Sequence, residues 1–335
     1  MVLAEKALIA RVRRMASART NAAVLTGIGD DCAVLRLPAA RGKELRREKK
    51  DVLVTTDFSL EGIHFRRDWH SAESVGHRCL ARGLSDIAAM GGEPVAAFLS
   101  LALPRDLPQS WVDRFADSLI GLAERYNVNL AGGDTAESPH GFLADVVVVG
   151  TVPHGKAVLR SQARPGDQIY VSGELGGSAA AVWLMRERMR RKRKRKLNPR
   201  EYLRHFFPEP RIELGRVLRE KGLVSSMIDI SDGLSTDLAH ICKESGVGAE
   251  LREEVIPRAS VGKPARPVDL AFALHGGEDY ELLFTAPRRK RIPACLAGIS
   301  ITNIGQVTRR PKVFVTNSGG ASYELRPQGW EHLRR

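Results

Sequence analysis

The chain has 335 residues, 43% of them hydrophobic, and this length predicts two domains rather than one core. No apolar run is long enough to span a membrane and no apolar segment follows Met1, so we expect neither a span nor a secretory signal, and a cytoplasmic location. The cysteines lack CxxC spacing, which predicts reduced thiols and argues against zinc or a disulfide framework; they are Cys32, Cys79, Cys242 and Cys295.

The net charge of +13 comes largely from one short segment. Between Arg186 and Lys196, nine residues are basic and one is acidic, which leaves +5 for the rest of the chain. Such a run is typical of a solvated helix face or loop, and it lacks the interleaved aromatic residues that stack on bases. We therefore do not expect the protein to bind nucleic acid.

The hydrophobic periodicity predicts strands alternating with helices, in chain order. In the first half it predicts strands at 52–56, 94–103 and 143–152 and helices at 71–90 and 109–126, with Ser71 as the first N-cap and Gly91-Gly92 as its stop. A stretch rich in Pro and Gly at 153–167 predicts a boundary, which gives domains 1–153 and 154–335. In the second half it predicts a helix opening around Ser178, a helix at 234–245, and strands at 168–172, 225–230, 277–285, 299–307 and 312–316. The fold class is α/β with mixed sheets.

Aspartates recur where an apolar strand gives way to a turn rich in Gly, Ser or Thr. The segments are Gly27-Ile-Gly-Asp-Asp31, Val54-Thr-Thr-Asp57, Leu130-Ala-Gly-Gly-Asp-Thr135, Ile228-Asp-Ile-Ser-Asp-Gly233 and Gly276-Gly-Glu-Asp-Tyr280, with Asp86 on a helix as a sixth place. One Gly-Asp pair usually marks only a turn, but six such carboxylates favour hard cations such as Mg²⁺, which prefer oxygen ligands. The sequence has no GxxxxGK[ST] phosphate loop and no dinucleotide fingerprint, so those nucleotide folds are excluded.

These motifs resemble those of the thiamine-monophosphate kinase family, within the aminoimidazole-ribonucleotide-synthetase-like superfamily. The resemblance rests on motifs in the family's order: Gly27-Ile-Gly-Asp-Asp-Cys, Thr55-Thr-Asp, Leu84-Ser-Asp, Gly132-Gly-Asp-Thr, Leu159-Arg-Ser, Asp229-Ile-Ser-Asp-Gly and Gly276-Gly-Glu-Asp-Tyr-Glu. It implies a two-domain enzyme, an N-terminal domain that pairs in a homodimer, and transfer of the γ-phosphoryl group of ATP to thiamine monophosphate with several Mg²⁺ ions.

The resemblance also assigns roles to individual residues. The implied metal ligands are Asp31, Thr55, Thr56, Asp57, Asp86, Asp134, Asp229 and Asp232. The implied ATP contacts are Gly133, Asp134, Arg160 and Ser231, and the implied contacts to thiamine monophosphate are His64, Glu278 and Trp330. No separate general base is expected, because the acceptor phosphate oxygen is already anionic near neutral pH. The chain departs from the family's pattern at Gln162, at Phe58-Ser59 and in the longer basic run.

Two rival hypotheses remain open at this stage. The chain could be another ATP-using synthetase of the superfamily, such as an aminoimidazole-ribonucleotide or selenophosphate synthetase; for the latter, Cys32 follows Asp-Asp instead of standing in a glycine-rich segment. It could also be a non-catalytic protein that binds nucleic acid through the basic run, although such a protein would not require the ordered acidic motifs.

Overall fold

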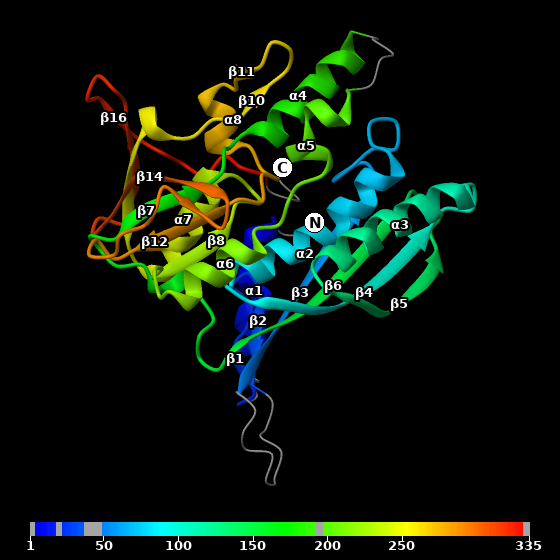
Figure 1. The fold of residues 1–335 in the computed structure, drawn as a ribbon, viewed down its shortest axis with the longest axis horizontal. Helices are drawn as coiled ribbons and strands as arrows, with labels where there is room; N and C mark the ends of the chain where they lie inside the picture. The colour runs from blue at the N-terminus through cyan, green and yellow to red at the C-terminus, as the bar shows by residue number, and fades with distance from the viewer. Residues whose placement is uncertain (1–3, 18–21, 37–48, 192–196, 331–335) are drawn as a thin grey trace.

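A computed structural model describes residues 4–17, 22–36, 49–191 and 197–330, which form two β-sheets with helices packed on them (Figure 1). The first sheet has six strands in the order β1-β2-β3-β6-β4-β5. Only β4 and β5 run parallel to each other. Its strands are β1 (Val24–Thr26), β2 (Ala33–Leu35), β3 (Lys50–Leu60), β4 (Glu93–Leu103), β5 (Asn129–Glu137) and β6 (Leu143–Pro153).

Helices α2 (Ala72–Ala89) and α3 (Gln109–Arg125) lie along one face of this sheet (Figure 1). The hydroxyl oxygen of Ser71 accepts a hydrogen bond from the backbone N–H of Ser74 at 3.3 Å, which caps α2 as the sequence predicts. The earlier helix α1 (Glu5–Ser17) packs near the second half instead, where Arg13 forms an ion pair with Glu244 at 2.9 Å.

The other face of the first sheet remains partly open. Side chains alternate between the two faces of a strand, so Thr55 and Asp57 on β3 point toward the helices while Thr56 and Phe58 point away. On this outer face, Phe58 is 56% exposed and Phe98 on β4 is 39% exposed. Phe58 lies opposite Asp145 and Phe98 opposite Val147, so the two aromatic residues lie on either side of β6 on this face.

The second half contains a sheet in the order β16-β15-β9-β14-β7-β12-β8, with β13 paired to β14. Its strands are β7 (Gln168–Ser172), β8 (Ser226–Asp229), β9 (Gly248–Arg252), β12 (Leu282–Ala286), β13 (Cys295–Leu296), β14 (Ile299–Thr308), β15 (Val313–Thr316) and β16 (Ser322–Glu324). A separate pair is formed by β10 (Ser260–Val261) and β11 (Arg266–Pro267). The helices are α4 (Gly177–Arg190), α5 (Leu203–Phe206), α6 (Ile212–Glu220), α7 (Leu234–Ser245) and α8 (Leu270–His275), with short 3₁₀ turns η1 (Arg160–Gln162), η2 (Pro199–Glu201) and η3 (Glu253–Val255).

Helix α2 lies where the two halves meet, and this position brings their functional loops together. It contacts the first sheet and α3 on one side and α5, α6 and β8 on the other. Gly215 allows α6 to approach closely, because a Cβ at this position would lie 2.1 Å from the carbonyl oxygen of Ala88. One hydrophobic core therefore contains Leu84 of α2 together with Leu218 and Phe284 of the second half.

Most predicted elements are confirmed, with corrections at Asp57, at Asp134 and at the strand predicted at 277–285. Asp57 and Asp134 lie inside β3 and β5 and do not follow them, since both strands continue through their polar residues. The strand predicted at 277–285 begins only at Leu282, because Glu278 and Tyr280 adopt φ values of +64° and +51°. Among the described residues, no helix has both the length and the apolar character needed to cross a membrane.

Candidate active site

Three carboxylates from distant parts of the chain converge beside α2. Asp31 comes from the loop after β1, Asp86 from α2 and Asp229 from the end of β8, and one carboxylate oxygen of each lies within 4.8 Å of the others. These three residues, called here the acidic cluster, were all predicted as metal ligands. Asp229 belongs to the second half of the chain, so the cluster forms only when both halves are in contact.

Neighbouring side chains fix the orientation of the acidic cluster. The Thr55 hydroxyl donates a hydrogen bond to Asp86 at 2.5 Å, and the Ser85 hydroxyl donates one to Asp229 at 2.7 Å. Asp57 lies beside Asp86, and Arg82 on α2 approaches the Asp57 carboxylate at 3.8 Å. The predicted ligands Thr55 and Asp57 therefore belong to the same site as the cluster.

Arg160, predicted to contact ATP, is paired with the acidic loop after β1. Its guanidinium donates to Asp31 at 2.5 Å, and its backbone N–H donates to Asp30 at 3.1 Å. Its side chain is only 18% exposed. In this arrangement Arg160 partly neutralises the carboxylates and lies directly beside the acidic cluster.

The carboxylates of the cluster are difficult to ionise together. Burial, followed by the nearby charges of Asp57, Asp229 and Asp31, raises the pKa of Asp86 well above its usual range. Burial and the neighbouring Asp31 raise the pKa of Asp229 to about 7. Without a cation, the site must retain protons or tolerate strong repulsion, which is the electrostatic condition that favours binding of a divalent cation.

The donor set suits Mg²⁺. The cluster offers three carboxylates, with the Thr55 hydroxyl and the carboxylate of Asp57 beside them. Hard cations of this kind take oxygen ligands, and Mg²⁺ usually combines one or two carboxylates with phosphate oxygens and water. The residues present therefore fit the predicted metal.

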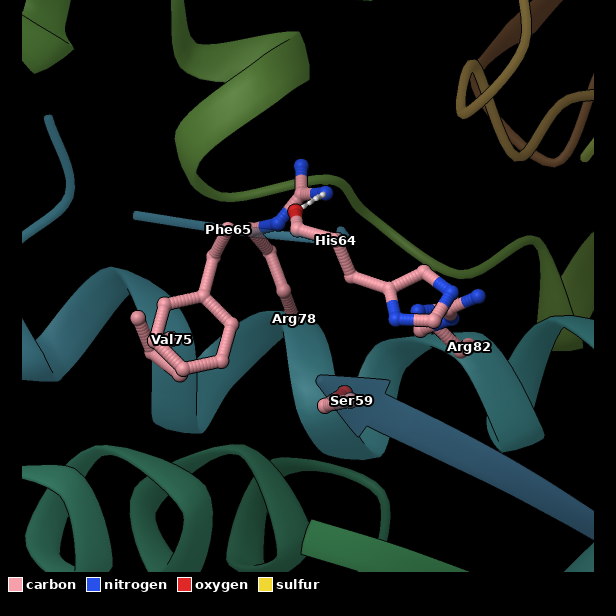
Figure 2. A pocket seen from close by; sticks show the side chains of 6 residues that line it. All are labelled: Ser59, His64, Phe65, Val75, Arg78 and Arg82. Carbon is pink, nitrogen blue, oxygen red and sulfur yellow. Dashed lines mark hydrogen bonds between the residues drawn. The ribbon is translucent and has the colours of Figure 1, made fainter. Parts of the chain in front are cut away.

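Two of the residues predicted to contact thiamine monophosphate, His64 and Glu278, meet at Arg78. The Arg78 guanidinium donates to Glu278 at 2.6 Å and to the backbone carbonyl of His64 at 3.4 Å. Arg78, Arg82 and His64 line a small cavity of about 10 Å³ together with Ser59, Phe65 and Val75 (Figure 2). Figure 2 shows Arg78 and Arg82 rising from the same helix toward the His64 segment.

Ser231, Asp232 and Trp330 lie on the same side of the second half as Glu278. The backbone N–H of Glu278 donates to the carbonyl of Ser231 at 2.7 Å, and the N–H of Trp330 donates to the carbonyl of Asp232 at 3.3 Å. The Trp330 side chain is 48% exposed. The loop after Asp229 thus links the acidic cluster to all the predicted substrate residues of the second half.

Thr56, Gly133 and Asp134 are not brought into the acidic cluster. Thr56 points to the outer face of the first sheet, where it donates to Asp145 at 2.7 Å. Asp134 lies in register with Ser100, which in turn lies opposite Asp145, so two strand spacings of roughly 5 Å separate the two carboxylates. These residues belong to a second polar row on the open sheet face.

Sequence reasoning missed several residues of the site. Arg78 and Arg82 were missed, although they precede the predicted ligand Asp86 at four-residue intervals, which places all three on one face of α2. That spacing is visible in the sequence, but nothing in it indicates that this face meets the loop of Glu278. Asp30 and Asp145 were also missed as partners of Arg160 and Thr56. Of the basic run, residues 192–196 lie outside the described residues, and Arg190 and Arg191 both pair with Glu187.

Comparison with known proteins agrees with this geometry. Residues 29–152 match the family model described as AIR synthase related protein, N-terminal domain, and residues 164–317 match the corresponding C-terminal domain. The chain is 38% identical to the thiamine-monophosphate kinase of Escherichia coli K12 over 99% of both chains. It is 32% identical to that of Bacillus subtilis, over 94% of this chain and 95% of the relative.

Solved structures give the same result. A structure described as AaThiL complexed with AMPPCP and TMP superimposes with a TM-score of 0.82 at 32% identity, covering 99% of each chain. The thiamine-monophosphate kinase from Stenotrophomonas maltophilia K279a superimposes with a TM-score of 0.71 at 34% identity, covering 94% of this chain and 97% of that one. On this sequence, fold and site, the chain belongs to the AIR synthase related family, and within it to the thiamine-monophosphate kinases.

Proposed function

We propose that this kinase transfers the γ-phosphoryl group of ATP directly to thiamine monophosphate, giving ADP and thiamine diphosphate. A terminal oxygen of the acceptor phosphate forms a bond to the γ-phosphorus, and the bond from that phosphorus to the β–γ bridging oxygen breaks as ADP leaves with the electron pair. The observation that carries this proposal is the convergence of Asp31, Asp86 and Asp229 next to the loop that holds Glu278.

The main obstacle to this reaction is the repulsion between two phosphate groups. We propose that several Mg²⁺ ions bind at the acidic cluster and at Asp57, Thr55 and Asp232, where they would offset that charge and align the phosphates. Thr56 and Asp134, also carried over as ligands, stay part of this proposal although they lie on the other sheet face. Thr55 and Ser85 orient the carboxylates through their hydroxyl groups.

The protein's own groups bind and orient the substrates. Arg160, Ser231 and Gly133 are proposed to contact ATP, with Arg160 exchanging its pairing with Asp31 for the nucleotide's phosphates. His64, Glu278 and Trp330 are proposed to contact thiamine monophosphate. We propose no separate general base, because the second ionisation of a phosphate monoester, with a pKa near 6, leaves the attacking oxygen anionic at neutral pH.

The first experiment follows product formation directly. The purified protein is incubated with ATP, Mg²⁺ and thiamine monophosphate, and thiamine diphosphate is measured by chromatography. Product should appear with metal, disappear with EDTA and fall steeply in Asp57→Asn. If the folded protein binds ATP yet makes no product, the kinase proposal is wrong and a related synthetase reaction takes its place.

We further propose a homodimer formed through the open face of the first sheet. Phe58 and Phe98, which flank β6 on that face and are 56% and 39% exposed, support it, since apolar side chains that gather on one face can mark an interface between subunits. Light scattering after size exclusion should give twice the chain mass, and Phe98→Asp should shift the protein toward monomer. Tyr323→Asp, at a 42% exposed site on β16, serves as the control. A wild-type monomer would refute this proposal.

The proposal also covers the domain boundaries and the cellular location. We propose residues 1–153 as the metal-binding and dimerisation domain and 154–335 as the domain that completes the substrate site, which the family matches at 29–152 and 164–317 support. A cytoplasmic location is proposed as well, and the four cysteines, none of them in a disulfide, are in keeping with it.

A further inference from the structure

One buried guanidinium connects the two residues proposed to hold thiamine monophosphate. The Arg78 side chain is 4% exposed and lies on α2, at the junction of the two halves. It donates to Glu278 from the second half at 2.6 Å and to the carbonyl of His64 from the first half at 3.4 Å. Its other terminal nitrogen donates to the backbone carbonyl of His205 on α5.

The histidines behind Arg78 hold it in one orientation. The nitrogen of Arg78 that bonds the His205 carbonyl also lies 3.4 Å from Nδ1 of His205. The Ser178 hydroxyl is hydrogen-bonded to the same atom at 2.8 Å, and a hydrogen bond of 2.9 Å joins Nε2 of His205 to Nε2 of His70. Nδ1 of His70 lies within hydrogen-bond distance of the Arg66 backbone, 3.2 Å from its N–H and 3.1 Å from its carbonyl oxygen.

Glu278 needs such support because its backbone is unusual. Its φ of +64° is uncommon for a residue with a side chain, and its N–H is tied to Ser231 at 2.7 Å. Arg78 contacts Oε1, and the side chain remains 24% exposed, so part of the carboxylate still faces outward. Although burial opposes ionisation, Arg78 and the other neighbouring cations lower the pKa of Glu278 to about 2. An anionic group held in this way complements the positively charged thiazolium ring of thiamine monophosphate.

We propose that Arg78 is a positioning residue for thiamine monophosphate, which fixes the carboxylate of Glu278 and the His64 segment in one geometry and is itself fixed by the buried His205–His70 pair. This proposal rests on the proposed function, in which Glu278 and His64 contact that substrate. Arg78 acts through these residues and does not itself touch the reacting atoms.

The test separates positioning from stability with two variants. Arg78→Gln removes the charge and the forked donor, and Arg219→Gln is the matched control. The Arg219 side chain is 7% exposed and also joins the halves, by donating to the carbonyl of Gly91 at 2.6 Å. It makes no hydrogen bond or ion pair with Glu278. Arg78→Gln should raise KM for thiamine monophosphate at least roughly 10-fold while KM for ATP stays within about 3-fold. Arg219→Gln should leave both KM values unchanged.

A double variant tests whether Arg78 acts through Glu278. Glu278→Gln alone should raise KM for thiamine monophosphate, and adding Arg78→Gln to it should change KM by less than about 3-fold, because the residue being positioned is already altered. Multiplicative effects, an unchanged KM in folded Arg78→Gln, or equal rises for both substrates would overturn the proposal. An inactive wild-type protein would instead refute the proposed function.

Hydrogen exchange provides a readout that does not depend on turnover. The amides of Glu278 and Tyr280 bond to Ser231 and Ile230, so they should exchange slowly in the wild-type protein and in Arg219→Gln. They should exchange faster in Arg78→Gln and in the milder Arg78→Lys, which serves as the reporter if the first variant does not fold. Unchanged protection in Arg78→Lys would count against the proposal.

Discussion

Neutralising Asp86 should make the metal-free protein more stable while abolishing its response to Mg²⁺. Its carboxylate lies within 4.8 Å of those of Asp31 and Asp229. Two unit charges at that separation repel by about 3.5 kcal/mol at an effective dielectric constant near 20. Asp86→Asn removes this repulsion and keeps an oxygen that can accept the hydrogen bond from Thr55.

The stability gained by Asp86→Asn depends on pH, because protonation of the carboxylates removes the same repulsion. The pKa of Asp86 is raised well above its usual range and that of Asp229 is raised to about 7. The folded protein therefore binds more protons than the unfolded chain above pH 4, and the cluster's contribution to the free energy of unfolding falls as pH rises toward 7. Asp86→Asn should match the wild type near pH 4 and exceed it by about 2 to 4 kcal/mol above pH 7.

Urea and thermal unfolding in EDTA measure this difference. For a chain of this length, it corresponds to a rise in Tm of roughly 3 to 6 °C. Mg²⁺ should raise the Tm of the wild type and leave that of Asp86→Asn almost unchanged. Asp51→Asn is the control with the opposite sign, since hydrogen bonds from Arg36 and Gly155 overcome burial and lower the pKa of Asp51. If Asp86→Asn lost stability in EDTA at pH 8 and kept the Mg²⁺ response, the electrostatic reasoning would be refuted.

Three further predictions follow from the fold and the site. Asp57→Asn and Asp134→Asn should each lower kcat at least roughly 100-fold, with partial rescue at high Mg²⁺; near-normal turnover of these two and of Asp86→Asn would contradict the multi-metal proposal. Burial and then Arg78 lower the pKa of His70 to about 4, so the free energy of unfolding should fall by up to roughly 3 kcal/mol as pH falls from 6.5 to 4. His70→Gln should flatten that part of the pH–stability curve, and an unchanged curve would show that His70 does not cause the loss. Gly133→Ala should lower Tm and activity together, because the residue has φ of +155° and a Cβ would lie 1.8 Å from the carbonyl oxygen of Leu99; a variant with wild-type Tm would show that β5 can shift away.

The residue types of the site and most of the secondary structure follow from local sequence. Ser71 and Gly91-Gly92 set the ends of α2 through local backbone preferences, and the run Val146–Val149 formed a strand because β-branched residues suit a buried pleated sheet. The recurring aspartates favoured a hard cation because Mg²⁺ takes oxygen ligands, and the resemblance to the kinase family singled out Asp31, Asp86 and Asp229 among them.

The grouping of these residues depends on how the sheets and helices pack together. Thr55 and Thr56 are neighbours in sequence, yet the two-residue period of β3 sends one to Asp86 and the other to Asp145 on the opposite face. Arg78 meets Glu278 across 200 positions of the chain because α2 is buried between both halves. Local propensity does not encode such contacts, since the packing of two sheets against one helix sets them.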